Sequence, residues 1–105
     1  MSYWNIEALT GYKPKTTFWQ DFTIADAFGV AGIRDTYKRA FNGWKSNYEY
    51  LTELVMVLNW KLWAHHEKGN EAIAKVYQEL WEEADQWCCE NLKGEALSYY
   101  YSTTD

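Results

Sequence analysis

Apolar side chains recur three and four positions apart along most of this chain, and that spacing places them on one face of an α-helix. Four such stripes follow one another. In chain order they are Trp19, Phe22, Ala25, Phe28; Val30, Ile33, Tyr37, Ala40, Trp44; Leu51, Val55, Leu58, Leu62; and Ile73, Tyr77, Leu80, Ala84, Trp87. The pattern predicts an all-α fold, a compact bundle of about four helices in one domain, residues 1–105.

Capping signals mark the ends of the predicted helices. Thr17 to Gln20 fits a capping box that opens the first helix, which is expected to end near Gly29. Ser46 to Glu49 fits a second capping box and opens a helix that runs to about Glu67. Apolar residues surround this long helix on nearly all sides, which is typical of a central, buried helix. The sequence leaves open whether residues 18–45 form one kinked helix or two.

The two ends of the chain lack the helical period. Residues 98–103, Ser-Tyr-Tyr-Tyr-Ser-Thr, favour extended structure, as do the first dozen residues. A single short strand cannot satisfy its own backbone groups, so the two termini are expected to form a short strand pair. Residues 13–15, Lys-Pro-Lys, predict a turn or loop that enters the first helix.

Aromatic residues make up 19% of the chain, with seven tryptophans among them. Rings supply much buried area per side chain, so an aromatic-rich core is expected, and tryptophans left outside it predict a homo-oligomer. No run reaches the roughly 18 apolar residues that a membrane span needs, and the N-terminus lacks the pattern of a secretory signal. We therefore expect a cytoplasmic protein in which the adjacent Cys88 and Cys89 stay reduced.

Charge is distributed unevenly along the chain. The net charge is −5, and residues 71–105 carry eight acidic residues against two lysines. An acidic helix face is either a solvated surface or a surface that meets a basic partner. The candidate protein-binding residues are acids of the last long helix and two aromatic residues: Glu79, Glu82, Glu83, Glu90, Trp44 and Tyr48.

The adjacent histidines His65 and His66 are the most conspicuous candidates for chemistry. Neighbouring helical residues point about 100° apart, so the two imidazoles cannot bind one metal from the same face. The residues four positions on, Gly69 and Asn70, are not metal ligands. Cys88 lies beside a core stripe, and no Glu-x-x-His pair, phosphate loop or nucleophile elbow occurs. We therefore expect no catalytic residue, no metal and no cofactor.

Residues 22–31, FTIADAFGVA, resemble the first helix and turn of helix-turn-helix repressors, with Ala25 four positions before the turn glycine Gly29. The family pattern requires an apolar residue six positions past that glycine, where this chain has Asp35. DNA binding through residues 22–45 is the alternative hypothesis. The residues that would contact phosphates are the basic residues of the second helix: Arg34, Lys38, Arg39 and Lys45.

A further resemblance covers most of the chain. ADAFG (25–29), RDTYKRAF (34–41), YLTELVMVLNWK (50–61) and LKGEALSYYYSTTD (92–105) are similar to segments of small proteins encoded in prophages and conjugative elements of Gram-positive gut bacteria. The resemblance implies a context, in which small acidic proteins bind host or element proteins, and no activity or site residues. Our first hypothesis is a non-catalytic accessory protein of a mobile element whose partner is a host or mobile-element protein.

Overall fold

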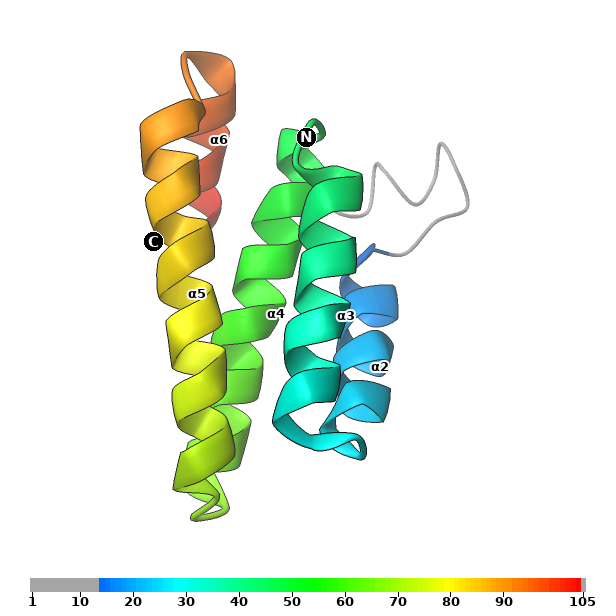
Figure 1. The fold of residues 1–105 in the computed structure, drawn as a ribbon. Helices are drawn as coiled ribbons and strands as arrows, with labels where there is room; N and C mark the ends of the chain where they lie inside the picture. The colour runs from blue at the N-terminus through cyan, green and yellow to red at the C-terminus, as the bar shows by residue number, and fades with distance from the viewer. Residues whose placement is uncertain (1–13, 105) are drawn as a thin grey trace.

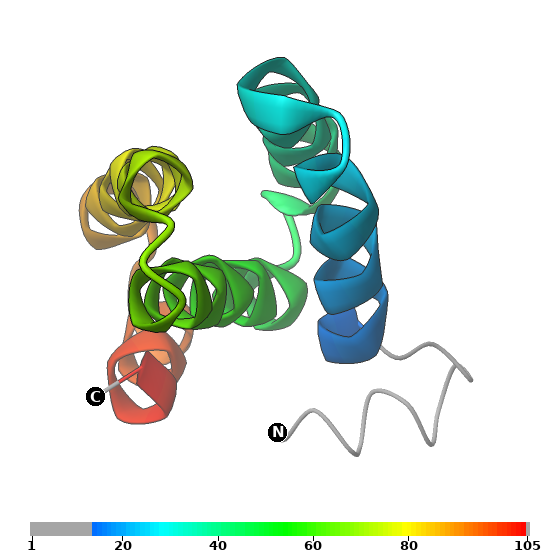
Figure 2. The ribbon, with the colours of Figure 1, turned by 90° about the horizontal axis from the view of Figure 1, so that it is seen from below.

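The computed structural model describes residues 14–104, and these residues fold into five helices and no strand (Figure 1). The helices are α2 (Pro14–Asp26), α3 (Gly29–Trp44), α4 (Tyr48–Glu67), α5 (Glu71–Asn91) and α6 (Glu95–Thr104). Seen from below, α4 lies between α2 and α3 on one side and α5 and α6 on the other (Figure 2). The all-α class and the central long helix are confirmed, and residues 14–104 alone contain one helix more than the four or so predicted.

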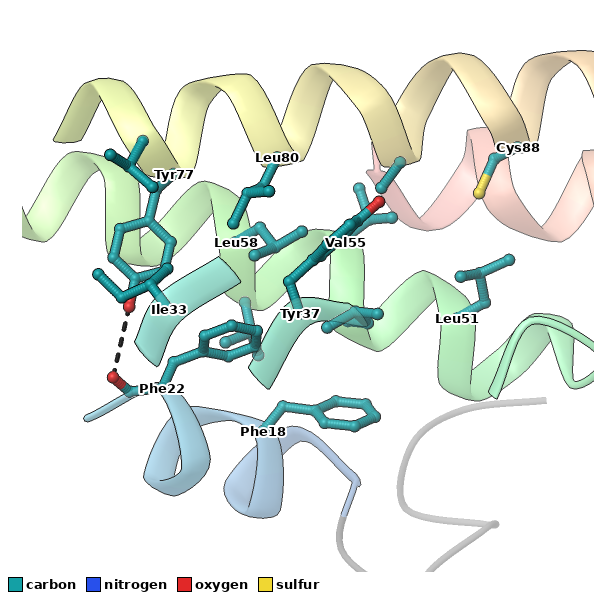
Figure 3. Packing of buried hydrophobic residues seen from close by; sticks show 14 of the residues in the cluster. Phe18, Phe22, Ile33, Tyr37, Leu51, Val55, Leu58, Tyr77, Leu80 and Cys88 are labelled. Atoms are coloured by element: carbon teal, nitrogen blue, oxygen red, sulfur yellow. Dashed lines mark hydrogen bonds between the residues drawn. The ribbon is translucent and has the colours of Figure 1, made fainter. Parts of the chain in front are cut away.

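The core is built around α4, whose buried side chains face both sides of the bundle. Leu51, Val55 and Leu58 of the predicted stripe are at most 1% exposed, and Leu54 and Val57 add a second fully buried side. Figure 3 shows the residues that pack on this layer, which are Phe18 and Phe22 from α2, Ile33 and Tyr37 from α3, and Tyr77, Leu80 and Cys88 from α5. Neighbouring helices therefore cover α4 on both sides, which explains its apolar circumference.

The start of α2 is earlier than the sequence indicates. The helix begins at Pro14, so the loop expected at Pro14 and Lys15 and the cap expected at Thr17 are wrong, while Lys13 lies outside the described residues. Proline suits the first helical position because its missing N–H would have no intrahelical partner there and its φ is already helical.

The buried face of α2 also differs from the predicted stripe. Trp19 and Phe28, which the spacing placed on that stripe, are exposed, and Phe18 is buried instead. The helix ends at Asp26, so Phe28 lies in the turn that follows and no longer shares the helical face.

A two-residue turn separates α2 from α3, so residues 18–45 form two helices. Gly29 has a φ of 76°, in the left-handed region that glycine adopts without steric cost. Gly32 faces the end of α2 so closely that a Cβ there would lie 2.5 Å from the Phe28 Cβ and 3.1 Å from the Ala25 carbonyl oxygen. The close approach of the two helices at this corner therefore depends on glycine.

Gly32→Ala is expected to lower the free energy of unfolding by about 1–3 kcal/mol, because the added methyl group overpacks the corner. Gly43→Ala is the matched control, since nothing lies within 4 Å of its Cβ position in the same helix. The control should gain up to about 1 kcal/mol from the better helix propensity of alanine. Urea unfolding of both variants measures the difference, and equal gains in stability would contradict the close contact.

The N-cap of α4 lies one residue beyond the predicted cap. Asn47, and not Ser46, caps the helix, with its side-chain oxygen accepting hydrogen bonds from the backbone N–H groups of Glu49 and Tyr50, both at 3.2 Å. The other end of α4 is at Glu67, as predicted.

The C-terminal segment is a helix, so the strand predicted for residues 98–103 is wrong. Tyr100 of α6 is 1% exposed and its hydroxyl donates a hydrogen bond to Asp85 of α5, while the Tyr99 ring meets Tyr48 edge-on at 5.3 Å. These contacts outweigh the extended preference of three tyrosines, because β-propensity depends on the packing that the surroundings offer. The first dozen residues, expected to pair with this segment, lie outside the described residues.

Candidate functional site

A cluster of polar side chains joins the end of α2 to α4 and α5. Oδ2 of Asp26 accepts hydrogen bonds from Lys61 Nζ at 2.9 Å and from His65 Nε2 at 3.0 Å, and Oδ1 accepts one from the Tyr77 hydroxyl at 2.5 Å. Lys61 also donates to the Thr23 hydroxyl at 3.0 Å. We call Asp26, Lys61, His65 and Tyr77 the carboxylate cluster.

Helical spacing places Lys61 and His65 together, and the end of α2 brings Asp26 to them. Lys61 and His65 are four residues apart and continue the buried face of Leu58 on α4, while Asp26 is the last residue of α2. Asn70, just beyond α4, directs its amide nitrogen at His65 Nδ1 at 3.2 Å, which assigns the proton to Nε2 in the neutral ring. The imidazole also stacks on the Tyr77 ring, with centroids 5.5 Å apart.

The two histidines have different surroundings. His65 lies inside the carboxylate cluster, whereas His66 is exposed, pairs with Glu71 at 2.7 Å and meets the Trp63 ring edge-on. The pair therefore does more than terminate a buried helix, because His65 also connects α4 to α2.

The surroundings favour the ionised form of the Asp26 carboxyl group and the neutral form of the Tyr77 hydroxyl. Burial raises the pKa of Asp26, but the hydrogen bonds from Tyr77, Lys61 and His65 outweigh it and hold that pKa below its ordinary value. Burial, together with the bond to the carboxylate, raises the pKa of the Tyr77 hydroxyl. An ionised carboxylate that accepts three hydrogen bonds has little capacity left for a substrate, so the geometry favours a structural role.

The thiol of Cys88 is held in its protonated form. Its side chain is fully buried, and burial followed by the charges of Asp85 and Cys89 raises its pKa to about 12. Cys88 follows Tyr77 by eleven residues on α5, roughly 16 Å along the helix, which places the thiol far from His65. Among residues 14–104, no three His, Cys, Asp or Glu side chains are placed to hold a metal ion.

Where α3 packs against α5, residues predicted to bind DNA lie next to residues predicted to bind a protein partner. Arg34 of α3 and Glu79 of α5 form an ion pair at 2.9 Å. Next to this pair lies a groove of about 370 Å³, which we call the acidic groove. It is lined by Tyr37, Lys38, Phe41 and Asn42 from α3 and by Glu83, Gln86, Trp87 and Glu90 from α5.

Aromatic rings lie between the charged residues of the acidic groove. The ring of Phe41 meets that of Trp87 edge-on at 5.3 Å and that of Tyr37 at 5.7 Å. Burial and then the charge of Glu83 raise the pKa of the Tyr37 hydroxyl. Among residues 17–104, no basic side chain lies within ion-pair distance of Glu83 or Glu90.

The other predicted site residues lie elsewhere. Glu82 accepts a hydrogen bond from Gln78 and does not line the acidic groove. Trp44 and Tyr48 are half-buried and make edge contacts with Tyr50 and Tyr99, so they are not openly exposed aromatic residues.

All four basic residues predicted for DNA contact are exposed, but two of them are paired with acidic side chains. Arg34 pairs with Glu79, Arg39 pairs with Asp35 of its own helix at 3.2 Å, and Lys38 lies in the acidic groove. Lys45 is exposed just past the end of α3.

No protein-family model, curated protein or solved structure matches this chain significantly. Across residues 14–104, none of the helices combines the length and the apolar character needed to cross a membrane. The geometry of the chain's own residues therefore carries the functional argument.

Sequence reasoning missed the carboxylate cluster. Asp26 and Lys61 are 35 residues apart, and no local motif links them. The available signal was Lys61 itself, a charged residue within an otherwise apolar stretch of a helix predicted to be buried, since such a residue requires a partner.

Proposed function

We propose that this chain is a non-catalytic binding protein whose acidic groove takes a basic segment of a partner protein, either from the host or from a mobile element. The observation that carries the proposal is that aromatic rings and the carboxylates of Glu83 and Glu90 line the same groove. Neither carboxylate has an ion-pair partner among residues 17–104. The net charge of −5 favours a basic partner over long range.

Arginine has the side chain that suits such a groove. Its planar guanidinium stacks on aromatic faces and also donates hydrogen bonds to carboxylates. Trp87 and Phe41 supply the rings, and Glu83 lies one helical turn before Trp87 on α5. Lys38, on the opposite wall, offsets part of the acidic charge and favours a partner segment with a single well-placed basic side chain.

Capture from a native-host lysate tests this proposal. The bait is the tagged full chain, compared with the double variant Glu83→Gln, Glu90→Gln and with the control Glu82→Gln, which changes the same helix outside the acidic groove. We expect the double variant to lose partners that the wild type and the control retain, and added salt to weaken their binding. Equal capture by all three proteins would contradict the proposal.

A nucleic-acid partner is the second candidate. It is supported by Gly29, the turn glycine of the helix-turn-helix resemblance, which has a positive φ between α2 and α3. The ion pairs of Arg34 and Arg39 reduce the positive charge that phosphate binding requires. A nuclease-treated arm of the same capture separates the two candidates. Partners that disappear with nuclease, and on changing Arg34 and Lys38 to alanine, would favour DNA binding.

A further inference from the structure

The two most exposed large apolar side chains of residues 17–104 lie at the corner between α2 and α3. Phe28 is 74% exposed and Ile24 is 62% exposed, more than any other large apolar side chain of residues 17–104. Both line a groove of about 720 Å³ that runs between the two helices, which we call the apolar groove. Soluble monomers rarely leave such side chains together in water.

The rim of the apolar groove carries charges of both signs. Arg39 lies between Asp35, its ion-pair partner, and Asp21, whose pKa burial raises and Arg39 lowers. By contrast, α5 carries six acidic residues and one lysine. Two copies that meet through α5 would therefore place acid against acid, whereas two copies that meet through the apolar groove would not.

We propose that the apolar groove binds a second copy of this chain in a two-fold symmetric dimer. In such a contact the same surface is used on both copies, so Phe28 of each copy enters the groove of the other. The mixed rim is complementary to itself, because Arg39 of one copy can meet Asp21 or Asp35 of the second. Charge complementarity selects a second copy over a strongly basic partner, which the acidic groove suits better.

The dimer and the partner-binding surface are separate. The apolar groove uses the side of α3 that carries Gly32 and Thr36, whereas the acidic groove uses the side that carries Tyr37 and Phe41. A dimer would therefore leave two acidic grooves open. The dimer does not depend on the proposed function, and either can fail without the other.

Sedimentation velocity of the full chain, from micromolar to several hundred micromolar, tests the dimer. We expect the wild type to shift towards dimer with concentration, and Phe28→Asp and Ile24→Asp to weaken dimerisation by at least about tenfold. Trp63→Ala is the control, because this residue is 53% exposed on α4 and does not line the apolar groove. It should dimerise like the wild type.

The substituted side chains of the two apolar-groove variants are mainly in water, and Phe28 is the N-cap residue of α3, where aspartate is favourable, so both variants should stay folded, which circular dichroism checks. A wild-type chain that stays monomeric at every concentration would overturn the proposal. Dimerisation of both aspartate variants at wild-type strength, or its loss in Trp63→Ala, would also overturn it.

Discussion

Asp26→Asn is expected to lower the free energy of unfolding by about 3–5 kcal/mol, because it leaves a buried ammonium group without its counter-charge. Lys61 is 5% exposed, and the Asp26 carboxylate is its only ion-pair partner among residues 14–104. The amide that replaces the carboxylate also presents an N–H₂ group to side chains that donate, so at least one of these hydrogen bonds is lost. Urea unfolding measures the change.

A double-mutant cycle provides the control. Lys61→Met removes the charge but retains a flexible apolar side chain, so the double variant Asp26→Asn, Lys61→Met should be destabilised less than the sum of the two single variants. Additive effects of the two substitutions would show that Asp26 does not stabilise the fold through its ion pair with Lys61.

The same cluster predicts acid sensitivity. The pKa of Asp26 in the folded chain lies below its ordinary value, so the unfolded chain takes up the proton first as the pH falls. The stabilisation is therefore complete above about pH 4–5, where the unfolded carboxylate is ionised, and is lost as the pH falls through the lower folded pKa. Asp26→Asn should show a smaller loss of stability over that interval than the wild type.

Leu58→Ala is expected to cost about 2–5 kcal/mol, because it opens a cavity in the centre of the core. Leu58 is 0% exposed on α4, where side chains from α2, α3 and α5 surround it (Figure 3). Leu62→Ala is the matched control, since Leu62 is only half-buried one turn further along the same helix. The control should cost clearly less, because solvent can fill the space that the side chain leaves.

Thermal or urea unfolding of the two leucine variants compares positions that the sequence does not distinguish. Both leucines belong to one predicted stripe and have the same chemistry. Similar costs at both positions would mean that α4 is not covered by its neighbours in the manner described.

Helical spacing predicted the long helices because their burial follows from local pattern. The stripe of α4 through Leu51, Val55 and Leu58 is buried, and α4 ends at the predicted residue. The same reasoning failed for α6, where three tyrosines suggested a strand. Its tyrosines contact Asp85 and Tyr48, which belong to other helices, and the local sequence of α6 cannot predict these contacts.

The candidate surfaces were only partly predictable for a similar reason. Arg34 and Glu79 were assigned to two competing functions, yet they form one ion pair. Their sequence separation of 45 residues hides a contact that depends on how α3 and α5 pack. The exposure of Phe28 could not be predicted either, because it depends on α2 ending at Asp26, two residues before Phe28.

The carboxylate cluster also bears on the order of folding. The chain forms two helical hairpins, α2 with α3 and α4 with α5, each joined by a short connection (Figure 1). Contacts within a hairpin are close in sequence and can form early, whereas Asp26 reaches Lys61 and Tyr77 across 35 and 51 residues. Bonds that form after the folding transition state affect the unfolding rate. In kinetic terms, we expect the loss of this one carboxylate to raise the unfolding rate, while the rate at which each hairpin forms depends on its own local contacts.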